Sequence, residues 1–541
     1  MRSPAAERRL LLVLILFAVA VGVVARIAHL DRKLFWQDES ITALQVSGHA
    51  LAEFRREFDG RVHPVWEIQS FYERDPTTGI ATVVRTLAAE DPQHPPLFYV
   101  FDRLALDAAG GGAAATYRLP SVVFGILAIG FAFLLGTELY RSKTGGGILA
   151  ALVALSPMHV LYARQAREYA LFMCIVLAST FCLLRALDRR RALNWGAYAV
   201  TVSLGIYTDS IFGLVIGAHA VSTLLLARRD RRTLAGYALA TAAGLGTFAP
   251  WGLNAVHSKG HIEGLLVWGA NVYPVKFLAE KWAFNVAAVF FDAEFADLRL
   301  AFVAAIVLAI VLASIVAFAR TAAPRERAIA LPLMLIPIAT FVAVDVTQGS
   351  HFSTIPRFLL AGWIGLEVIV ASALVAAIAA RARWALPAFA ILVIGGAIAA
   401  YVDNGAENWW DNNNQVAYQA VARTIDVTPA PLVLDEDFYE VPLLLARYLR
   451  PDASFLLFHV PAVPVLPKGT RQAYLVIPSP PLLAAMKARE REVYSIDNVS
   501  PNATTIISGF HRDLASDKTF KPYDFLQNEQ PGNALWSLRL R

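Results

Sequence analysis

Cysteine is nearly absent: the 541 residues include two, Cys174 and Cys182. They lie eight positions apart in one apolar run, where a helix would hold their backbones too far apart to bridge. A disulfide scaffold is therefore excluded, and both are expected to be plain core residues. Charge is also scarce, since charged residues make up 17% of the chain and hydrophobic residues 57%. A soluble domain carries about 25% charged residues, so the bilayer is the expected solvent.

Long apolar runs recur from Leu10 to Tyr401 and then stop. One span needs roughly 20 apolar residues, so a polytopic α-helical membrane protein with about eleven to thirteen transmembrane helices is predicted. The arginines before the first run also suit a signal peptide, but the run is too long and has no clean small-residue cleavage site. We interpret it as an uncleaved span. The further runs are near 118–139, 147–161, 169–186, 194–212, 213–227, 235–254, 298–319, 328–345, 358–380 and 383–402.

The net charge of +5 does not indicate a nucleic-acid partner, because the basic residues form short clusters after alternate runs. Such clusters are typical of cytoplasmic loops. The run Leu97–Ala109 would disturb this alternation if it crossed. It is short and contains Asp102 and Arg103, so a half-crossing or interfacial helix is expected. The clusters are at 141–143, 185–191, 228–232, 320–327 and 381–383.

Two domains are predicted: a transmembrane catalytic domain over 1–402, with 31–96 as its first extracytoplasmic segment, and an extracytoplasmic domain over 403–541. The second is expected to be a small α/β domain, because helix-like and strand-like stretches alternate in it. The helix-like stretches are Gln415–Ile425 and Val441–Tyr448, and the strand-like ones are Pro431–Asp435, Ala473–Ile477 and Ala534–Arg541.

An acidic pair, Asp38 and Glu39, follows the first span. Partial burial near the membrane surface raises a carboxyl pKa towards that of a useful base. Adjacent residues point in different directions, so we expect one to react and the other to bind or brace. A solvated helix cap is the competing interpretation, because Asp is a good N-cap.

Three outer boundaries carry His or Arg. His94 precedes two prolines and is suited to meet a phosphate, although a simple helix start is the alternative. Arg164 and Arg167 are three apart, so on a helix they would share a face and fork around one anion. Pairing with Glu168 or snorkelling is the alternative. Arg357 is a further outer cation, for which a lipid headgroup contact competes with a role in catalysis.

Other polar residues in or beside the apolar runs are weaker candidates. His219, Asp209 and Asp345 are suited to an ion path, but no related second set occurs, so satisfied hydrogen bonds are the favoured interpretation. A metal is possible in another outer loop, where no diagnostic ligand spacing occurs. That loop carries His257, His261, Asp292 and Glu294.

Taken in order, the motifs resemble the protein mannosyltransferase-like bacterial glycosyltransferases of the GT-C fold and the related lipid A aminoarabinose transferases. The resemblance covers roughly residues 1–410. It rests on Asp38-Glu39, His94-Pro95-Pro96-Leu97, Arg118-Leu119-Pro120-Ser121, the stretch from Ser156-Pro157 to Glu168-Tyr169, Pro356-Arg357-Phe358 and Glu407-Asn408-Trp409-Trp410.

This resemblance implies an inverting transfer of a sugar from a polyprenyl-phosphate donor to a lipid, glycan or protein acceptor at the outer face of the inner (plasma) membrane. Asp38 matches the family's proposed base, with Glu39 beside it. Arg164, Arg167 and Arg357 are the expected phosphate contacts, together with His94, which stands where the aminoarabinose transferases have Lys. No cofactor is required by this chemistry, and a divalent metal remains possible. A lipid flippase or transporter and a glycan ligase or polymerase are the competing functions.

Overall fold

The computed structural model describes residues 4–266, 269, 273–292, 298–407, 409, 414–436, 440–459, 463–489, 494–500 and 535–540. The chain forms two compact units. The helical unit comprises Met1–Leu30, Leu87–Asp102 and Arg118–Gly405, and the sheet unit comprises Asp31–Thr86, Arg103–Tyr117 and Ala406–Arg541. The domain boundary near residue 402 stays a prediction. Most of the first polar segment, Asp31–Thr86, belongs to the same compact unit as the C-terminal residues.

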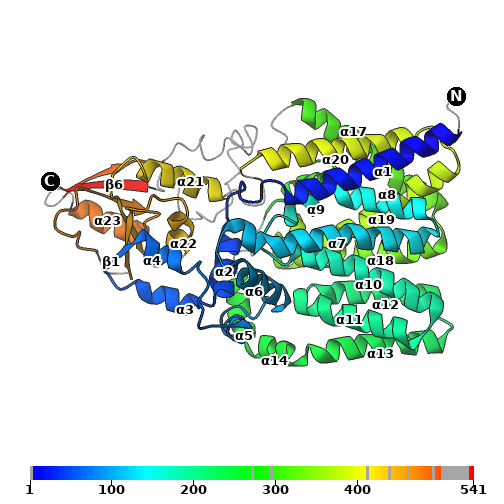
Figure 1. The fold of residues 1–541 in the computed structure, drawn as a ribbon, viewed down its shortest axis with the longest axis horizontal. Coiled ribbons are helices and arrows are strands. Elements are labelled where there is room, and N and C mark those ends of the chain that lie inside the picture. The colour runs from blue at the N-terminus through cyan, green and yellow to red at the C-terminus, as the bar shows by residue number, and fades with distance from the viewer. Residues whose placement is uncertain are drawn as a thin grey trace. The chain divides into compact units, whose positions relative to one another are not determined.

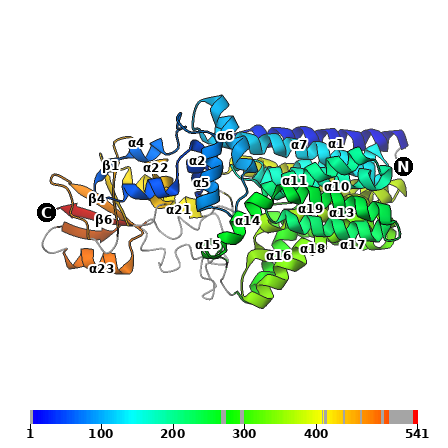
Figure 2. The ribbon, with the colours of Figure 1, turned by 90° about the horizontal axis from the view of Figure 1, so that it is seen from below.

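Helices make up the described part of the helical unit, and Figures 1 and 2 show α10, α11 and α13 running side by side within it. Three helices cross from one unit to the other: α5 (Ile80–Glu90), α6 (Leu97–Ala109) and α7 (Ala114–Tyr140). The remaining elements are α1 (Pro4–Ile27), α8 (Lys143–Leu155), α9 (Pro157–Tyr162), α10 (Tyr169–Arg189), α11 (Ala192–Thr208), α12 (Phe212–Ala227), α13 (Arg231–Thr247), α14 (Ala249–His257), α15 (Lys259–Leu265), α16 (Val275–Ala288), α17 (Leu298–Thr321), α18 (Pro324–Gln348), η3 (Phe352–Thr354), η4 (Pro356–Leu359), α19 (Leu360–Ala379) and α20 (Ala385–Gly405).

Seven helical segments in the described residues are long and apolar enough to span a membrane, which confirms the predicted polytopic class. They lie in α1, α7, α10, α17, α18, η4 with α19, and α20. The other predicted spans are shorter helices: α8 and α12 are apolar, and α11 and α13 have 17 residues each. α6 has 13 residues, so it is about 20 Å long and too short to cross a core about 30 Å thick, as the sequence suggested.

Ion pairs in the helical unit show which loops share an end of the bundle. The Asp188 carboxylate at the end of α10 accepts hydrogen bonds from Arg141, after α7, and from Arg325, at the start of α18. At the opposite end, Arg164 donates to the carbonyl oxygen of His29, just beyond α1, and to the carboxylate of Asp403, near the end of α20. The basic clusters at 141–143, 185–191 and 320–327, predicted on one side, therefore lie at one end, and Arg164 lies at the other.

Close backbone approach holds α7 against α8. A Cβ placed on Gly146 of α8 would lie 2.5 Å from the carbonyl oxygen of Phe133 in α7, nearer than side chains tolerate. Gly22 of α1 is similarly placed, since its Cβ would lie 2.3 Å from the carbonyl oxygen of Ala154. Small residues at helix contacts are characteristic of membrane bundles, where dispersion rather than the hydrophobic effect favours association.

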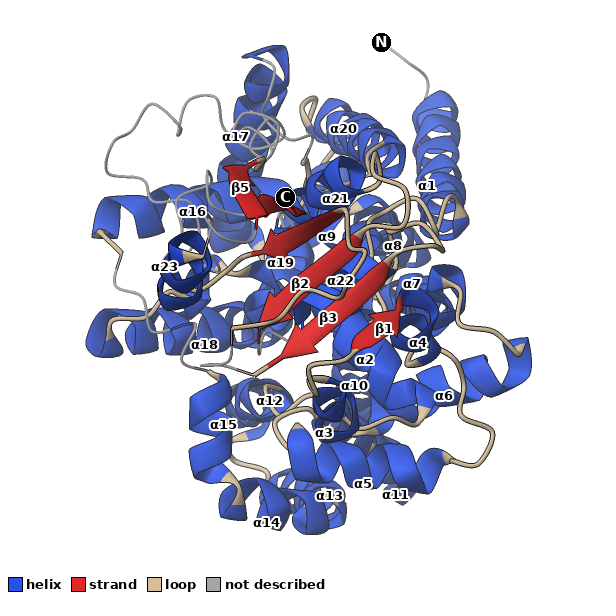
Figure 3. Cartoon of the chain, turned by 90° about the vertical axis from the view of Figure 1, so that its left-hand side faces the viewer, coloured by secondary structure: helices blue, strands red, loops and turns tan. Residues whose placement is uncertain are grey.

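The sheet unit contains a six-stranded mixed sheet of order β1-β3-β2-β4-β6-β5, whose strands Figure 3 shows in red. β2 is parallel to β3 and β4, while β1, β6 and β5 are joined by antiparallel pairing. The central strand β2 is buried along its whole length, including Asp435 and Glu436 at its end. The strands are β1 (Val62–Pro64), β2 (Leu432–Glu436), β3 (Ser454–Phe458), β4 (Gln472–Val476), β5 (Tyr494–Asn498) and β6 (Leu535–Leu540).

The predicted α/β character of the C-terminal residues is confirmed, because β2, β4 and β6 fall on the three strand-like stretches. The helices of this unit are α2 (Gln37–Ser47), α3 (Leu51–Phe54), η1 (Arg55–Glu57), α4 (Val65–Ser70), α21 (Asn414–Ile425), α22 (Glu440–Ala446) and α23 (Pro480–Ala488). The strand β1, contributed by the first polar segment, was not predicted. Glu294, Asn408 and Trp410 lie outside the described residues.

Candidate active site

The acidic pair lies in the first turn of α2, where its two carboxylates differ in environment. Trp36 is the N-cap residue, with extended backbone angles. Its backbone N–H donates to Oε2 of Glu39 across 3.3 Å, so Glu39 closes the helix start and is fully buried. Asp38 is half-buried. Glu39 therefore braces the turn, while Asp38 is the more accessible carboxylate.

The approach to α2 is held by C-terminal residues of the same unit. The backbone N–H of Leu34 donates to the carbonyl oxygen of Glu407 across 2.9 Å. The guanidinium of Arg447 stacks between two rings, 3.8 Å from the centroid of Phe35 and 4.1 Å from that of Tyr72. Arg447 is a functional candidate that the sequence did not reveal, because it follows α22 in the domain that carried no motif.

His94 lies between α5 and α6 and contacts one acid and one base. Its Nδ1 is 2.8 Å from Oδ2 of Asp91, and its Nε2 is 2.9 Å from Nη2 of Arg167. Since a guanidinium can only donate, Nε2 accepts from Arg167 in the neutral ring, whose hydrogen then lies on Nδ1 towards Asp91. Burial and the Arg167 cation oppose the charged imidazolium, but Asp91, together with Glu168, outweighs them and raises the pKa of His94.

Arg167 is enclosed by polar partners in the helical unit. It donates to the hydroxyl of Tyr99 across 3.1 Å and to Oε1 of Glu168 across 3.1 Å. Asp209, just beyond α11, belongs to the same electrostatic group: burial and the Glu168 charge raise its pKa to about 6. The group therefore holds acids as well as cations, and sequence reasoning missed Asp91 and Tyr99.

The prediction that Arg164 and Arg167 share one face of a helix is wrong. Residues 163–168 form turns between α9 and α10, and the two side chains separate towards different partners. Nη1 of Arg164 is 2.7 Å from Oδ2 of Asp403, and both side chains are buried. Arg164 thus joins α9 to the ends of α1 and α20, while Arg167 joins α10 to His94.

Arg357 lies on η4, in the connection that follows α18. α18 begins at the Arg325 end of the bundle, so a helix of 25 residues brings Arg357 to the Arg164 end. The guanidinium is half-buried and lies 5.5 Å from the ring centroid of Phe358. It is therefore more accessible than Arg164 or Arg167, which are 1% and 3% exposed.

The weaker candidates have the hydrogen-bond partners expected of structural residues. His219 contacts the hydroxyls of Thr180 and Tyr198 at 3.1 Å each. Asp345 accepts from the backbone N–H of Phe352 and of Ser353, which stabilises the end of α18.

In the outer loop that carries His257 and His261, the described residues form no metal-ligating group of three side chains. The rings of His257 and His261 contact the carbonyl oxygens of Leu253 and Glu90. Within the described residues, the one metal-ligating group of three side chains lies in the sheet unit, at Glu57, His63 and Glu67.

Part of the chain matches the model of a known protein family. Residues 93–253, which include His94, Arg164 and Arg167, match the model of the dolichyl-phosphate-mannose-protein mannosyltransferase family. Comparison with curated protein sequences gives no significant match.

Two solved structures of ArnT from Cupriavidus metallidurans share the fold. The one bound to undecaprenyl phosphate is 15% identical, with a TM-score of 0.52, over 90% of this chain and 96% of that chain. The apo form is 15% identical, with a TM-score of 0.53, over 92% and 97%. An oligosaccharyltransferase from Archaeoglobus fulgidus in the apo form is 14% identical over 93% of this chain and 72% of that chain, with a TM-score of 0.49.

The resemblance expected from the sequence motifs is thus confirmed by a family pattern over 93–253 and by similarity along nearly the whole chain. The chain is a multi-span membrane protein of the GT-C glycosyltransferase fold.

Proposed function

We propose that the protein transfers a sugar from a polyprenyl-phosphate donor to a hydroxyl acceptor on the extracytoplasmic face of the membrane, with inversion at the anomeric carbon. The observation that carries this proposal is the placement of Asp38: a half-buried carboxylate in the first turn of α2, beside a glutamate that is fully buried and capping. The donor class is supported by the ArnT structure of the same fold, which was solved with undecaprenyl phosphate.

In the proposed step Asp38 is the general base. Its carboxylate takes the proton of the acceptor hydroxyl as that oxygen forms a bond to the anomeric carbon. The bond between the anomeric carbon and the donor phosphate oxygen breaks, and its electron pair leaves with the polyprenyl phosphate. Asp38 then releases the proton to water, which restores the carboxylate. A phosphate monoester anion is a good leaving group, so fixed cations suffice to stabilise its charge.

Burial separates the four candidate phosphate contacts into two roles. Arg357 and His94 are the more accessible, since Arg357 is half-buried and the His94 side chain is 26% exposed. We assign them to the phosphate. Arg167 orients His94 through Nε2, and Arg164 anchors α9 through Asp403, so these two are positioning residues.

The test is sugar transfer by the purified protein with its Asp38→Asn variant. The variant keeps size and helix position while removing the base, so transfer should fall by about 10²-fold or more. Glu53→Gln, an exposed carboxylate in the same segment, is the matched control and should transfer normally. A well-folded Asp38→Asn protein with unchanged transfer would exclude Asp38 as the base.

The product decides between the competing functions. One added sugar per acceptor indicates a transferase, and a transferred chain indicates a ligase or polymerase. Movement of the lipid carrier across vesicles without any new glycosidic bond would indicate a flippase and would reject the proposal.

A further inference from the structure

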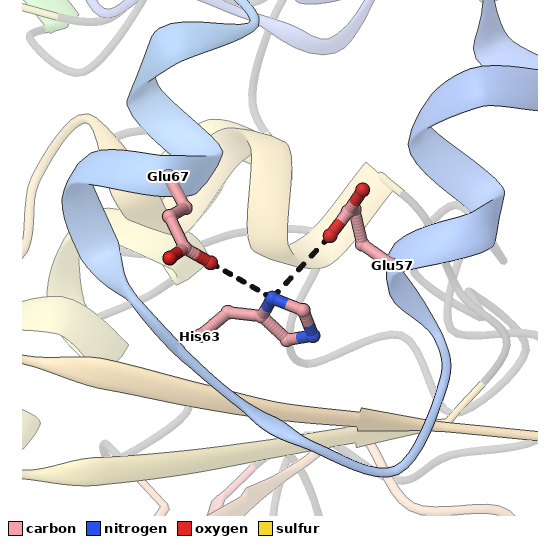
Figure 4. A group of neighbouring side chains, drawn as sticks. All are labelled: Glu57, His63 and Glu67. Atoms are coloured by element: carbon pink, nitrogen blue, oxygen red, sulfur yellow. Dashed lines mark hydrogen bonds and ion pairs between the residues drawn. The ribbon is translucent and has the colours of Figure 1, made fainter.

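Three side chains in the sheet unit converge on one ring nitrogen. Nδ1 of His63 lies 3.3 Å from Oε2 of Glu57 and 3.0 Å from Oε2 of Glu67. Figure 4 shows the two carboxylates reaching this nitrogen from different sides, one from η1 and one from α4. A ring nitrogen carries at most one hydrogen, so it cannot make a full hydrogen bond to both carboxylates.

We propose that Glu57, His63 and Glu67 bind a zinc ion. Zinc takes nitrogen and carboxylate ligands at about 2.0–2.2 Å in tetrahedral geometry, which places neighbouring ligand atoms roughly 3.3 Å apart. The observed nitrogen–oxygen separations of 3.0 and 3.3 Å are close to this distance between neighbouring ligand atoms. All three ligand atoms lie within 4.8 Å of one another.

The contact of the second ring nitrogen also suits a metal-bound imidazole. Nε2 of His63 is 3.1 Å from Oδ1 of Asp59, the arrangement in which a metal-bound imidazole donates its other N–H to a carboxylate. Asp59 is itself held by the backbone N–H of Arg61 across 2.9 Å and by the Arg61 side chain.

Charge and access also suit a dication. The His63 side chain is 5% exposed and faces three carboxylates, of which one is paired with Arg61. The Glu57 and Glu67 side chains are 31% and 38% exposed, which leaves a path for the ion and a fourth position for water. With Asp59 as the outer partner, this is a four-coordinate Glu₂His site whose fourth ligand is water.

The position in the fold assigns the ion a structural role. His63 is the middle residue of β1, paired with Phe455 of β3 at the edge of the sheet. The ligands come from η1, β1 and α4 in turn, so the ion ties the three short elements together. A strand of three residues has little stability of its own, and the ion fixes the edge that it forms.

The experiment uses the full chain in detergent, stripped with a chelator and dialysed. Zinc content is measured by mass spectrometry after addition of zinc chloride, and affinity is measured by competition with a chromophoric chelator. One equivalent is expected to bind and to raise the thermal midpoint. Glu57→Gln and Glu67→Gln, at half-exposed positions, should each lose that equivalent, and Asp59→Asn should weaken binding by about 10–100-fold.

Glu53→Gln is the matched control, because Glu53 makes a His–Glu contact of 3.3 Å with His49 in the same segment but lies outside the group of three. It should bind zinc normally. The proposal is overturned if the unaltered chain binds no zinc at micromolar concentration, or if Glu57→Gln and Glu67→Gln bind as much as the control. Sugar transfer is measured separately, so failure here leaves the Asp38 assignment intact.

Discussion

Arg167 donates to Nε2 of His94 across 2.9 Å, which joins the start of α10 to the turn before α6. The two residues are 73 positions apart, and each also contacts an acid. His94 is therefore held in one orientation from both ring nitrogens.

The stability contributed by His94 should depend on pH. Burial and the Arg167 cation disfavour its charge, yet Asp91 and Glu168 raise its pKa above the ordinary value of about 6.5. A raised folded-state pKa stabilises the fold below about pH 6.5, and this contribution is lost as the pH rises through the folded-state value. His94→Gln should therefore lower the thermal midpoint more at about pH 5.5 than at about pH 8.5. Asp91→Asn should remove most of this difference, and a gap that widens at high pH would contradict the assignment.

Breaking the Arg164–Asp403 ion pair should destabilise the fold. Both side chains are buried, and Nη1 of Arg164 lies 2.7 Å from Oδ2 of Asp403. Arg164→Met leaves the carboxylate without its cation and should destabilise the fold by about 3–5 kcal/mol. Adding Asp403→Leu should recover most of that loss, since no charge then remains buried. Unfolding in a denaturing detergent measures all three proteins. Equal losses in the single and double variants would show that the contact, not the orphaned charge, matters.

Adding a methyl group at the contact between α7 and α8 should destabilise the fold. Gly146→Ala places a Cβ 2.5 Å from the backbone oxygen of Phe133, which cannot move without shifting α7, so a loss of about 1–3 kcal/mol is expected. Gly130→Ala is the control, because no atom lies within 4 Å of its Cβ position. Thermal midpoints of the two variants should differ clearly, and similar midpoints would contradict close packing here.

Substitutions of the two carboxylates in the first turn of α2 should have different effects on the thermal midpoint. Glu39→Ala removes the acceptor of the Trp36 N–H and should cost about 1 kcal/mol. Asp38→Asn, at a half-buried position that does not cap the helix, should leave the thermal midpoint unchanged. If Asp38→Asn lowers the midpoint as much as Glu39→Ala, loss of transfer in that variant would no longer identify a base.

Hydropathy predicted the membrane class because the bilayer imposes length and apolarity on every span, and α1, α10 and α20 carry both signals in their own residues. Strand β1 was missed, since three residues give no alternation and its partner is β3, far along the chain. The helix predicted over 164–167 does not form, because Arg164 pairs with Asp403 while Arg167 contacts His94 in a different direction. No local pattern reports such partners.

The order of strands in the sheet constrains biosynthesis. β6, formed by residues 535–540, lies between β4 and β5 and pairs with both. The segment that carries Asp38 emerges from the ribosome long before these residues, yet it belongs to the same compact unit. Nascent chains halted before residue 535 would have inserted their spans while lacking the strand that completes this sheet. We expect such chains to be recognised by quality-control proteases rather than to accumulate as partly active enzymes.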